Sequence, residues 1–539
     1  MSGLSRRGLL TSAAFAGAGL VAADVVAGTR PAVAAGAGAT GGACAPAFDS
    51  ITVQPGDTRY DSFLRAHNTR FTGRPDQVTI ATSPDHVAEA LGRAVAADRR
   101  VAVRSGGHCL EDFTASSEVK ELIDLSQMAD VHFDESRNAF SVGPGSIVAP
   151  TQHTLFKGWG VHIPSAGCSE VGLGGHILGG GYNFYSRIHG VAIDYLHAVE
   201  VVVVDADGQP RTIVATRKAN DPNRDLWWAH TGGGGGNFGV VTRYWLRTPS
   251  TKSAVPEKLL PRAGNQRVRV VQWSWESLSR QAFTTLVRNF CRWFELNSAP
   301  GAKGVQVWAS LSASHQSAGV IGLMAGVEDT VPGGEAMLDA MFADVTAGAH
   351  LKVASDTKYN LPWLDRENWF WGPPGRQKDK TSDLRKSYTE EQIATIYRYL
   401  TDDSINNPGA QVNLAAIGGK INTVRQDATA YAHRDTILRA YFTPGVWRSQ
   451  DQDAAHVTWV RKLYRDVYRR TGGVPVPDSI NGGAYINYPD VDLADPEWNT
   501  SGTPWHALYY RKNYARLQQV KKAYDPRNVF RHALSIRPA

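Results

Sequence analysis

A glycine-rich run at residues 167–182 (GCSEVGLGGHILGGGY) limits what this chain can fold into more than any other part of the sequence. Seven of its sixteen residues are glycine. Glycine loses more backbone entropy on folding than any other residue, so an ordinary helix or strand is not expected here. Glycine also lets the backbone approach a ligand closely, and a bound polyphosphate or flat cofactor would offset the entropy. The run therefore predicts a ligand-binding loop.

Two further glycine clusters lie at residues 104–108 (RSGGH) and 231–239 (TGGGGGNFG). The first follows a predicted strand at residues 101–103, and α/β folds commonly bind ligands where a strand ends. Residues 172–175 lack the strand–turn–helix spacing and the acidic residue of a dinucleotide fingerprint. Three clusters in the first half of the chain instead indicate one large cofactor that several loops contact.

The pattern of apolar residues predicts an α+β chain with two domains. Strands are expected at residues 78–81, 198–205 and 240–242, and a helix is expected after Ser83. After about residue 262, amphipathic helices such as 283–294 and 389–400 alternate with short strands such as 305–308. Near the C-terminus, a strand end is expected at residues 485–490 and a helix at 513–524. The sequence there again resembles that of the first domain. We predict a cofactor domain from residues 49–262 and 476–539, and a substrate domain from residues 263–475.

The first 35 residues predict an export signal. Arg6 and Arg7 form a twin-arginine pattern, an apolar stretch covers residues 9–26, and residues 32–34 (AVA) suit a cleavage site. Residues 36–48 are a Gly/Ala-rich linker. The twin-arginine export machinery carries folded proteins, so a cofactor can be loaded before export. We expect a secreted or cell-envelope protein with no membrane anchor after signal cleavage.

Charge and cysteine usage exclude some function classes. The 539-residue chain has a formal net charge of +6, but its basic residues are spread out, so no nucleic-acid partner is expected. Its four cysteines have no metal-ligand spacing, so no metal site is expected. A disulfide that involves Cys44 is possible in an exported protein, although the sequence does not identify its partner.

Six motifs, taken in order, resemble the berberine bridge enzyme-like family of FAD-linked oxidases. They are RSGGHC at 104–109, the run at 167–182, SRIHG at 186–190, GGGGGNFGVVT at 232–242, YINYPD at 485–490 and YDPRNVF at 524–530. The resemblance extends from about residue 50 to the C-terminus and is strongest to bacterial antibiotic-tailoring members. It implies a vanillyl-alcohol oxidase/PCMH-type FAD-binding domain beside an antiparallel-sheet substrate domain covered by helices.

The family resemblance implies an FAD held by two covalent bonds. His108 would bond the flavin 8α-methyl carbon, and Cys168 would bond C6. A histidyl substituent withdraws electron density and favours hydride uptake, and two tethers hold the cofactor in an open cleft. A structural loop histidine and a buried free thiol are the alternatives for an isolated His or Cys.

Other matching positions are expected to contact the cofactor. Backbone N–H groups of the first two glycine clusters would cradle the pyrophosphate, through Arg104, Ser105, Gly106, Gly107, Gly172, Gly174 and Gly175. Val171, His176, Gly179, Tyr182, Asn237, Val240 and Asn487 are expected to complete the site. A structural role that bonds backbone is the alternative for His176.

The resemblance implies hydride transfer from a C–H next to oxygen onto flavin N5, with O₂ as acceptor and H₂O₂ as product. A tyrosine of this family takes the hydroxyl proton, and residues 485–490 offer Tyr485 and Tyr488. In an extended strand the two would point to opposite faces, with Asn487 on the face of Tyr485, and the choice between them stays open. Tyr182 and Tyr185 are candidate substrate contacts, with core packing the alternative for Tyr185, and Gln411 and Asn413 are candidate polar contacts.

Val171 bears on the acceptor. In the family the residue at this position flanks the reactive carbon C4a of the flavin, where valine leaves room for O₂ and leucine blocks it. Core packing is the alternative for a valine.

The sequence is compatible with three functions. The first is oxidation of an alcohol or hemiacetal carbon in a sugar or glycosylated secondary metabolite. The second is oxidative cyclisation or dehydrogenation of a polyketide or alkaloid-like metabolite. The third is an inactive flavin-binding protein, against which His108, Cys168 and the two tyrosines argue.

Overall fold

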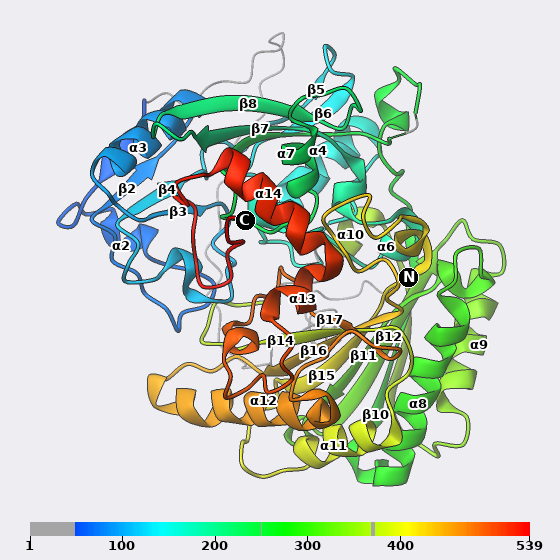
Figure 1. Ribbon diagram of the computed structural model, residues 1–539. Helices are drawn as coiled ribbons and strands as arrows, with labels where there is room; N and C mark the ends of the chain where they lie inside the picture. The colour runs from blue at the N-terminus through cyan, green and yellow to red at the C-terminus, as the bar shows by residue number, and fades with distance from the viewer. Residues whose placement is uncertain (1–48, 166, 250, 368–371) are drawn as a thin grey trace.

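The computed structural model describes residues 49–165, 167–249, 251–367 and 372–539. The predicted export signal, the linker and Cys44 lie outside these residues. The described chain forms three sheets, and Figure 1 shows the two smaller ones above the largest. No helix in these ranges is long and apolar enough to cross a membrane.

The four-stranded sheet, in the order β1-β2-β4-β3, carries the first glycine cluster. β1 pairs antiparallel with β2, whereas β2 and β3 both pair parallel with β4. The predicted helix is α3, which begins where the Ser83 hydroxyl accepts from His86 N–H and buries its apolar stripe. The elements of this region are β1 (Ile51–Val53), α2 (Tyr60–Phe63), β2 (Gln77–Ile80), α3 (Pro84–Ala96), β3 (Val101–Arg104) and β4 (Glu121–Asp124).

An antiparallel five-stranded sheet, in the order β5-β6-β9-β7-β8, packs beside it. The valine-rich strand β7 has no solvent face: Val199, Val201 and Val203 join one core cluster, and Val202 and Val204 join the core beneath α3. The elements are β5 (Val131–Asp134), β6 (Ala139–Val142), α4 (Val148–Trp159), α5 (Leu173–Leu178), α6 (Ser186–His189), β7 (Leu196–Val204), β8 (Pro210–Thr216), α7 (Arg224–Ala229) and β9 (Val240–Leu246).

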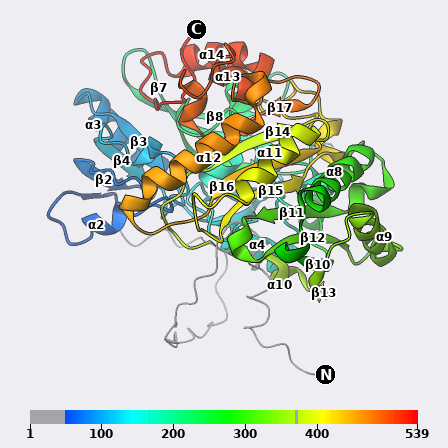
Figure 2. The same ribbon diagram turned by 90° about the horizontal axis from the view of Figure 1, so that it is seen from below.

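The antiparallel eight-stranded sheet, in the order β13-β10-β12-β11-β15-β16-β14-β17, forms the second half. Helices α8, α9, α11 and α12 cover one of its faces, as the view from below shows in Figure 2. The elements are β10 (Gln266–Ser274), α8 (Arg280–Asn297), β11 (Trp308–Ser314), β12 (Val320–Glu328), α9 (Gly334–Thr346), β13 (Val353–Leu361), α10 (Trp363–Glu367), β14 (Lys380–Leu384), α11 (Glu390–Leu400), β15 (Ala410–Ala416), β16 (Leu438–Pro444), α12 (Asp453–Val467) and β17 (Asn481–Gly483).

Strand alternation decides which side chains of this sheet reach the cavity between the two halves. Val412 and Leu414 of β15 pack into the core under the helices, so Gln411 and Asn413 face the other way and line the cavity. In β16 the same rule turns Arg439 and Tyr441 toward the cavity.

The chain then returns to the first half through α13 (Trp505–Tyr510) and α14 (Tyr514–Tyr524), and Leu517 and Val520 of α14 are buried. The returning segment is shared between the halves, because its strand β17 pairs with β14 of the eight-stranded sheet. The proposed boundaries at residues 262 and 475 stay predictions.

Three local predictions are wrong. Residues 303–306 form a 3₁₀ turn, and β11 begins only at Trp308. Residues 173–178 of the glycine run form the helix α5, because burial of Leu173, Ile177 and Leu178 offsets the backbone entropy that the glycines lose. Residues 485–488 form a turn closed by a 2.9 Å bond from Tyr488 N–H to the Tyr485 carbonyl, so strand alternation does not apply there.

Candidate active site

A cavity of about 480 Å³ lies between the two halves of the protein. The three glycine clusters form one wall, and the inner face of the eight-stranded sheet forms the other. The turn at residues 485–488 and the segment 530–532 also line the cavity. Segments from most of the chain therefore converge on a single cavity.

The first two glycine clusters pack backbone against backbone. A Cβ on Gly106 would lie 2.4 Å from the Gly172 nitrogen, and one on Gly172 would lie 2.2 Å from the Gly106 nitrogen. Real Cβ contacts are never this short, so each glycine is required by the other. Close packing of the two loops is therefore enough to require glycine at Gly106 and Gly172, which also line the cavity.

Gly175 differs, because a Cβ there would meet no protein atom within 4 Å. Gly175 belongs to α5 and lines the cavity, so its missing side chain leaves open space on this helix. A wall of glycine backbone with such an opening fits a large flat cofactor such as FAD, which the first two clusters would hold through backbone N–H groups. The Arg104 guanidinium is already bound to Asp124, at 2.7 and 2.9 Å, so its side chain ties β3 to β4.

His108 lines the cavity under the ring of His67, with the ring centroids 4.0 Å apart. Burial lowers the pKa of His108 to about 3, helped by the nearby His67 and His176. The imidazole is therefore neutral at physiological pH and keeps a lone pair that can form a covalent bond. Cys168 lines the same cavity, and burial raises the pKa of its thiol.

Tyr485 is buried, and its hydroxyl already has two donors. Gly181 N–H donates to it at 3.0 Å, and the Asn487 side-chain amide donates at 2.8 Å. The same amide donates to the His176 carbonyl at 2.8 Å. Tyr485 and Asn487 thereby join the turn at residues 485–488 to the glycine run.

Tyr488 is half-buried and lines the cavity, and its hydroxyl lies 3.4 Å from that of Tyr182. Burial raises the pKa of the Tyr488 phenol, and the neighbouring Tyr182 raises it further. Tyr488 therefore needs a nearby positive charge to lose its proton.

Arg439 supplies that charge from β16. Its guanidinium carbon lies 3.8 Å from the ring centroid of Tyr485 and 4.5 Å from that of Tyr182, and its charge lowers the pKa of Tyr488. Asp383 holds the guanidinium through bonds of 2.7 and 2.9 Å. Burial alone would raise the pKa of Asp383, but Arg439 keeps it below its usual value.

The structure brings most of the predicted site residues to this cavity. They are Arg104, Ser105, Gly106, Gly107, His108, Cys168, Val171, Gly172, Gly174, Gly175, His176, Tyr182, Val240, Gln411, Asn413, Tyr485, Asn487 and Tyr488. Gln411 is 4% exposed, and its side-chain oxygen has no hydrogen-bond partner among the described residues, which leaves an acceptor for a substrate hydroxyl.

Three candidates are not among the described residues that line the cavity. Asn237 instead holds the third glycine cluster, because its amide donates to the carbonyl oxygens of residues 233, 234 and 235. Gly179 makes room for Asn487, whose side-chain oxygen would lie 1.9 Å from a Cβ there. Tyr185 is packed between the rings of His162 and Trp363, as the core alternative predicted.

Sequence reasoning missed His67 and Arg439. No motif marks His67, whose stacking on His108 depends on two loops meeting. Arg439 had a weak signal, because a charged residue at an inward position of an apolar strand (LRAYF, 438–442) requires a buried partner.

Comparisons with known proteins agree with this geometry. A family model described as "Berberine and berberine like" matches residues 484–537, and one described as "FAD binding domain" matches residues 75–213. Aclacinomycin-N/aclacinomycin-A oxidase of Streptomyces galilaeus is 45% identical over 99% of this chain and 98% of its own length.

Two solved structures are also similar. A flavoenzyme of shunt-product recycling in caerulomycin biosynthesis is 47% identical, with a TM-score of 0.89 over 91% of this chain and all of its own. A glycopeptide hexose oxidase crystallised with teicoplanin is 45% identical, with a TM-score of 0.88 over 92% of this chain and all of its own.

Proposed function

Because the chain belongs to the berberine bridge enzyme-like family of FAD-dependent oxidoreductases, we propose that it is an exported oxidase with bicovalently bound FAD. Its substrate is an alcohol or hemiacetal carbon of a sugar or glycosylated secondary metabolite. When bound, FAD supplies the hydride acceptor at N5 and passes the electrons to O₂, which gives H₂O₂. The similarity to aclacinomycin-N/aclacinomycin-A oxidase and to a glycopeptide hexose oxidase supports this substrate class.

The observation that carries the proposal is the meeting of His108, Cys168 and the tyrosine pair at one cavity. His108 and Cys168 would hold the flavin covalently. The neutral His108 imidazole has the lone pair for the bond at the 8α carbon, and its stacking on His67 fixes the ring plane. The Cys168 thiol must lose its proton before it bonds at C6.

Tyr488 is the base that accepts the substrate hydroxyl proton. It reaches the cavity, and Tyr182 is the only described partner of its hydroxyl, so a substrate oxygen can approach. Tyr485 is the weaker candidate, because its oxygen already accepts hydrogen bonds from Gly181 N–H and from the Asn487 amide, which leaves less room for a substrate oxygen. Arg439 favours the phenolate form of Tyr488, and Tyr485 is a positioning residue.

The base is tested by anaerobic flavin reduction in Tyr488→Phe and Tyr485→Phe. Loss of a general base typically costs about 10²–10⁴ in rate, so Tyr488→Phe should slow reduction by that factor with little change in substrate binding. Tyr485→Phe should lose less rate and more stability. Reduction at the wild-type rate in Tyr488→Phe contradicts the assignment.

Covalent attachment is tested by denaturation and peptide mapping. The flavin should stay with the denatured protein, and digestion should give one flavin joined to two peptides that carry His108 and Cys168. Mapping also separates Cys168 from Cys109, a second thiol that lines the cavity. Release of intact flavin from the denatured wild type would contradict covalent attachment.

The substrate class is tested by peroxide release across sugars, glycosylated metabolites and aglycones. We expect stoichiometric H₂O₂ with compounds that carry an oxidisable sugar carbon. Turnover only on aglycones, with a new ring or double bond, would favour cyclisation or dehydrogenation instead.

The proposed export is tested by the location of the full-length protein in wild-type cells and in cells that lack the twin-arginine machinery. It should leave the cytoplasm only in the former.

A further inference from the structure

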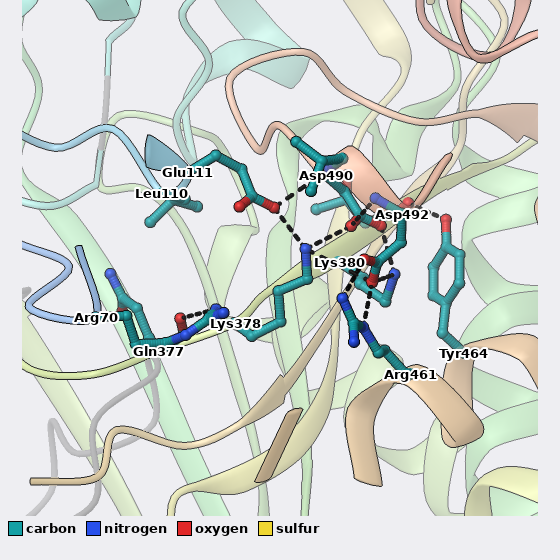
Figure 3. Close-up of polar contacts among 12 residues, drawn as sticks. Arg70, Leu110, Glu111, Gln377, Lys378, Lys380, Arg461, Tyr464, Asp490 and Asp492 are labelled. Atoms are coloured by element: carbon teal, nitrogen blue, oxygen red, sulfur yellow. Dashed lines mark hydrogen bonds and ion pairs between the residues drawn. The ribbon is translucent and has the colours of Figure 1, made fainter. Parts of the chain in front are cut away.

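Six charged side chains form a cluster just outside the cavity, shown in Figure 3. The members of this buried charge cluster are Glu111, Lys378, Lys380, Arg461, Asp490 and Asp492. Three are cations and three are anions, so their formal charges balance. All of these side chains are 2–4% exposed except that of Arg461, which is 30% exposed.

Lys378 is the centre of the cluster. Its ammonium group donates to the carboxylate of Glu111 and to that of Asp490, the latter at 2.7 Å. Lys380 reaches Asp490 at 2.6 Å and Asp492 at 2.7 Å. Burial alone would raise the pKa of Asp492, but Lys380 and Lys378 hold it well below its usual value.

The cluster joins the two segments that bear the proposed reactive groups. Glu111 follows His108 by three residues, and Asp490 follows Tyr488 by two. Glu111 also accepts from Val491 N–H at 3.3 Å, so it contacts the Tyr488 segment directly. Lys378 lies two residues before strand β14, which begins at Lys380 and contains Asp383, the partner of Arg439.

We propose that this buried charge cluster is a positioning device that sets the Tyr488 segment against the His108 segment across the cavity, with Lys378 as the positioning residue that bridges them. The proposal rests on the proposed function only in its choice of Tyr488 and His108 as reactive groups. None of the six side chains is among the described residues that line the cavity, so none is a catalytic residue.

Buried ion pairs are better suited to fixing the relative position of two segments than to stabilising the fold. Well-packed apolar residues often match or exceed a buried ion pair in stability, so its presence is weak evidence for a stabilising role. Short charge-assisted bonds, however, accept only a narrow geometry. Without Lys378, Asp490 would keep only Lys380 as its lysine partner and Glu111 would lose its cation, so the ion-pair bridge between the two segments would be lost.

The test compares holoenzyme variants Lys378→Met and Glu111→Gln with Arg187→Met. Arg187 is a matched control, because it is a 1% exposed cation that bonds Ser298 Oγ and the carbonyl oxygens of residues 297, 304 and 417. It does not line the described cavity. Glu111→Gln keeps the shape of the side chain and covers the case in which Lys378→Met does not fold.

Three readouts separate positioning from general stability. Hydrogen exchange of residues 105–113 and 484–493 should rise at least about tenfold in the cluster variants, and should stay at the wild-type rate in Arg187→Met. The flavin fraction bonded at His108 should fall while that at Cys168 is kept. Flavin reduction at saturating substrate should slow by about 100-fold with KM little changed, because a displacement near 1 Å can cost that much.

Unchanged local exchange in both cluster variants overturns the proposal, and so does an equal loss in Arg187→Met. A wild type without covalent flavin or sugar oxidation would instead overturn the proposed function. The exchange experiment would still decide whether the cluster holds the two segments together.

Discussion

Replacement of Gly179 by alanine tests the contact that joins the glycine run to the tyrosine turn. Gly179 has φ −94° and ψ −2°, which any residue adopts, so the added methyl group brings no backbone strain. Its Cβ would lie 1.9 Å from Asn487 Oδ1 and 2.4 Å from Cγ, whereas real contacts exceed 3.0 Å. The Asn487 side chain must therefore retreat by about 1 Å.

A displacement of this size breaks both bonds of the Asn487 amide. Each is 2.8 Å long, one to the His176 carbonyl and one to the Tyr485 hydroxyl, and a hydrogen bond is lost beyond about 3.5 Å. A buried polar group left without its partner costs about 1–3 kcal/mol. We expect Gly179→Ala to lower the free energy of unfolding by that amount and to slow flavin reduction, because Tyr485 loses one of its two donors.

The assay is denaturant unfolding together with anaerobic flavin reduction, with Gly158→Ala as the matched control. Gly158 is an exposed residue of α4 where a Cβ would meet nothing within 4 Å, so alanine should be neutral or slightly stabilising there. The reasoning is refuted if Gly179→Ala unfolds and reduces its flavin like Gly158→Ala.

Three further predictions follow from the same cavity. Gly175→Ala should leave the unfolding free energy of the flavin-free protein unchanged or raised, because the methyl group meets no protein atom, but should lower flavin content in the purified protein. Val171→Leu should slow reoxidation of the reduced enzyme in aerated buffer, measured by stopped flow, whereas sluggish wild-type reoxidation would contradict an oxidase. The stabilisation that Asp383 gains from Arg439 should be constant above about pH 4, the unfolded pKa of aspartate, and should be lost as the pH falls through its lower folded pKa. The difference in unfolding free energy between wild type and Asp383→Asn should therefore shrink only at acidic pH.

The sequence by itself identified the parts of the site that depend on local backbone requirements. The glycine clusters, His108 and Cys168 lie in motifs whose residues must be adjacent in the chain, so a linear pattern contains them. The pattern of apolar residues likewise predicted α3, β7 and α14, because the side chains that each element buries lie within its own sequence.

Tertiary structure decided what depends on residues far apart in the chain. The turn at residues 485–488 replaced the predicted strand, and it gives the hydroxyl groups of Tyr485 and Tyr488 different partners. Asn237 and Gly179 proved to hold the loops, because their neighbours lie up to about 300 residues away along the chain. His67, Arg439 and the buried charge cluster have their roles only because packing places distant side chains within a few ångströms, and such distances are not encoded in any local pattern.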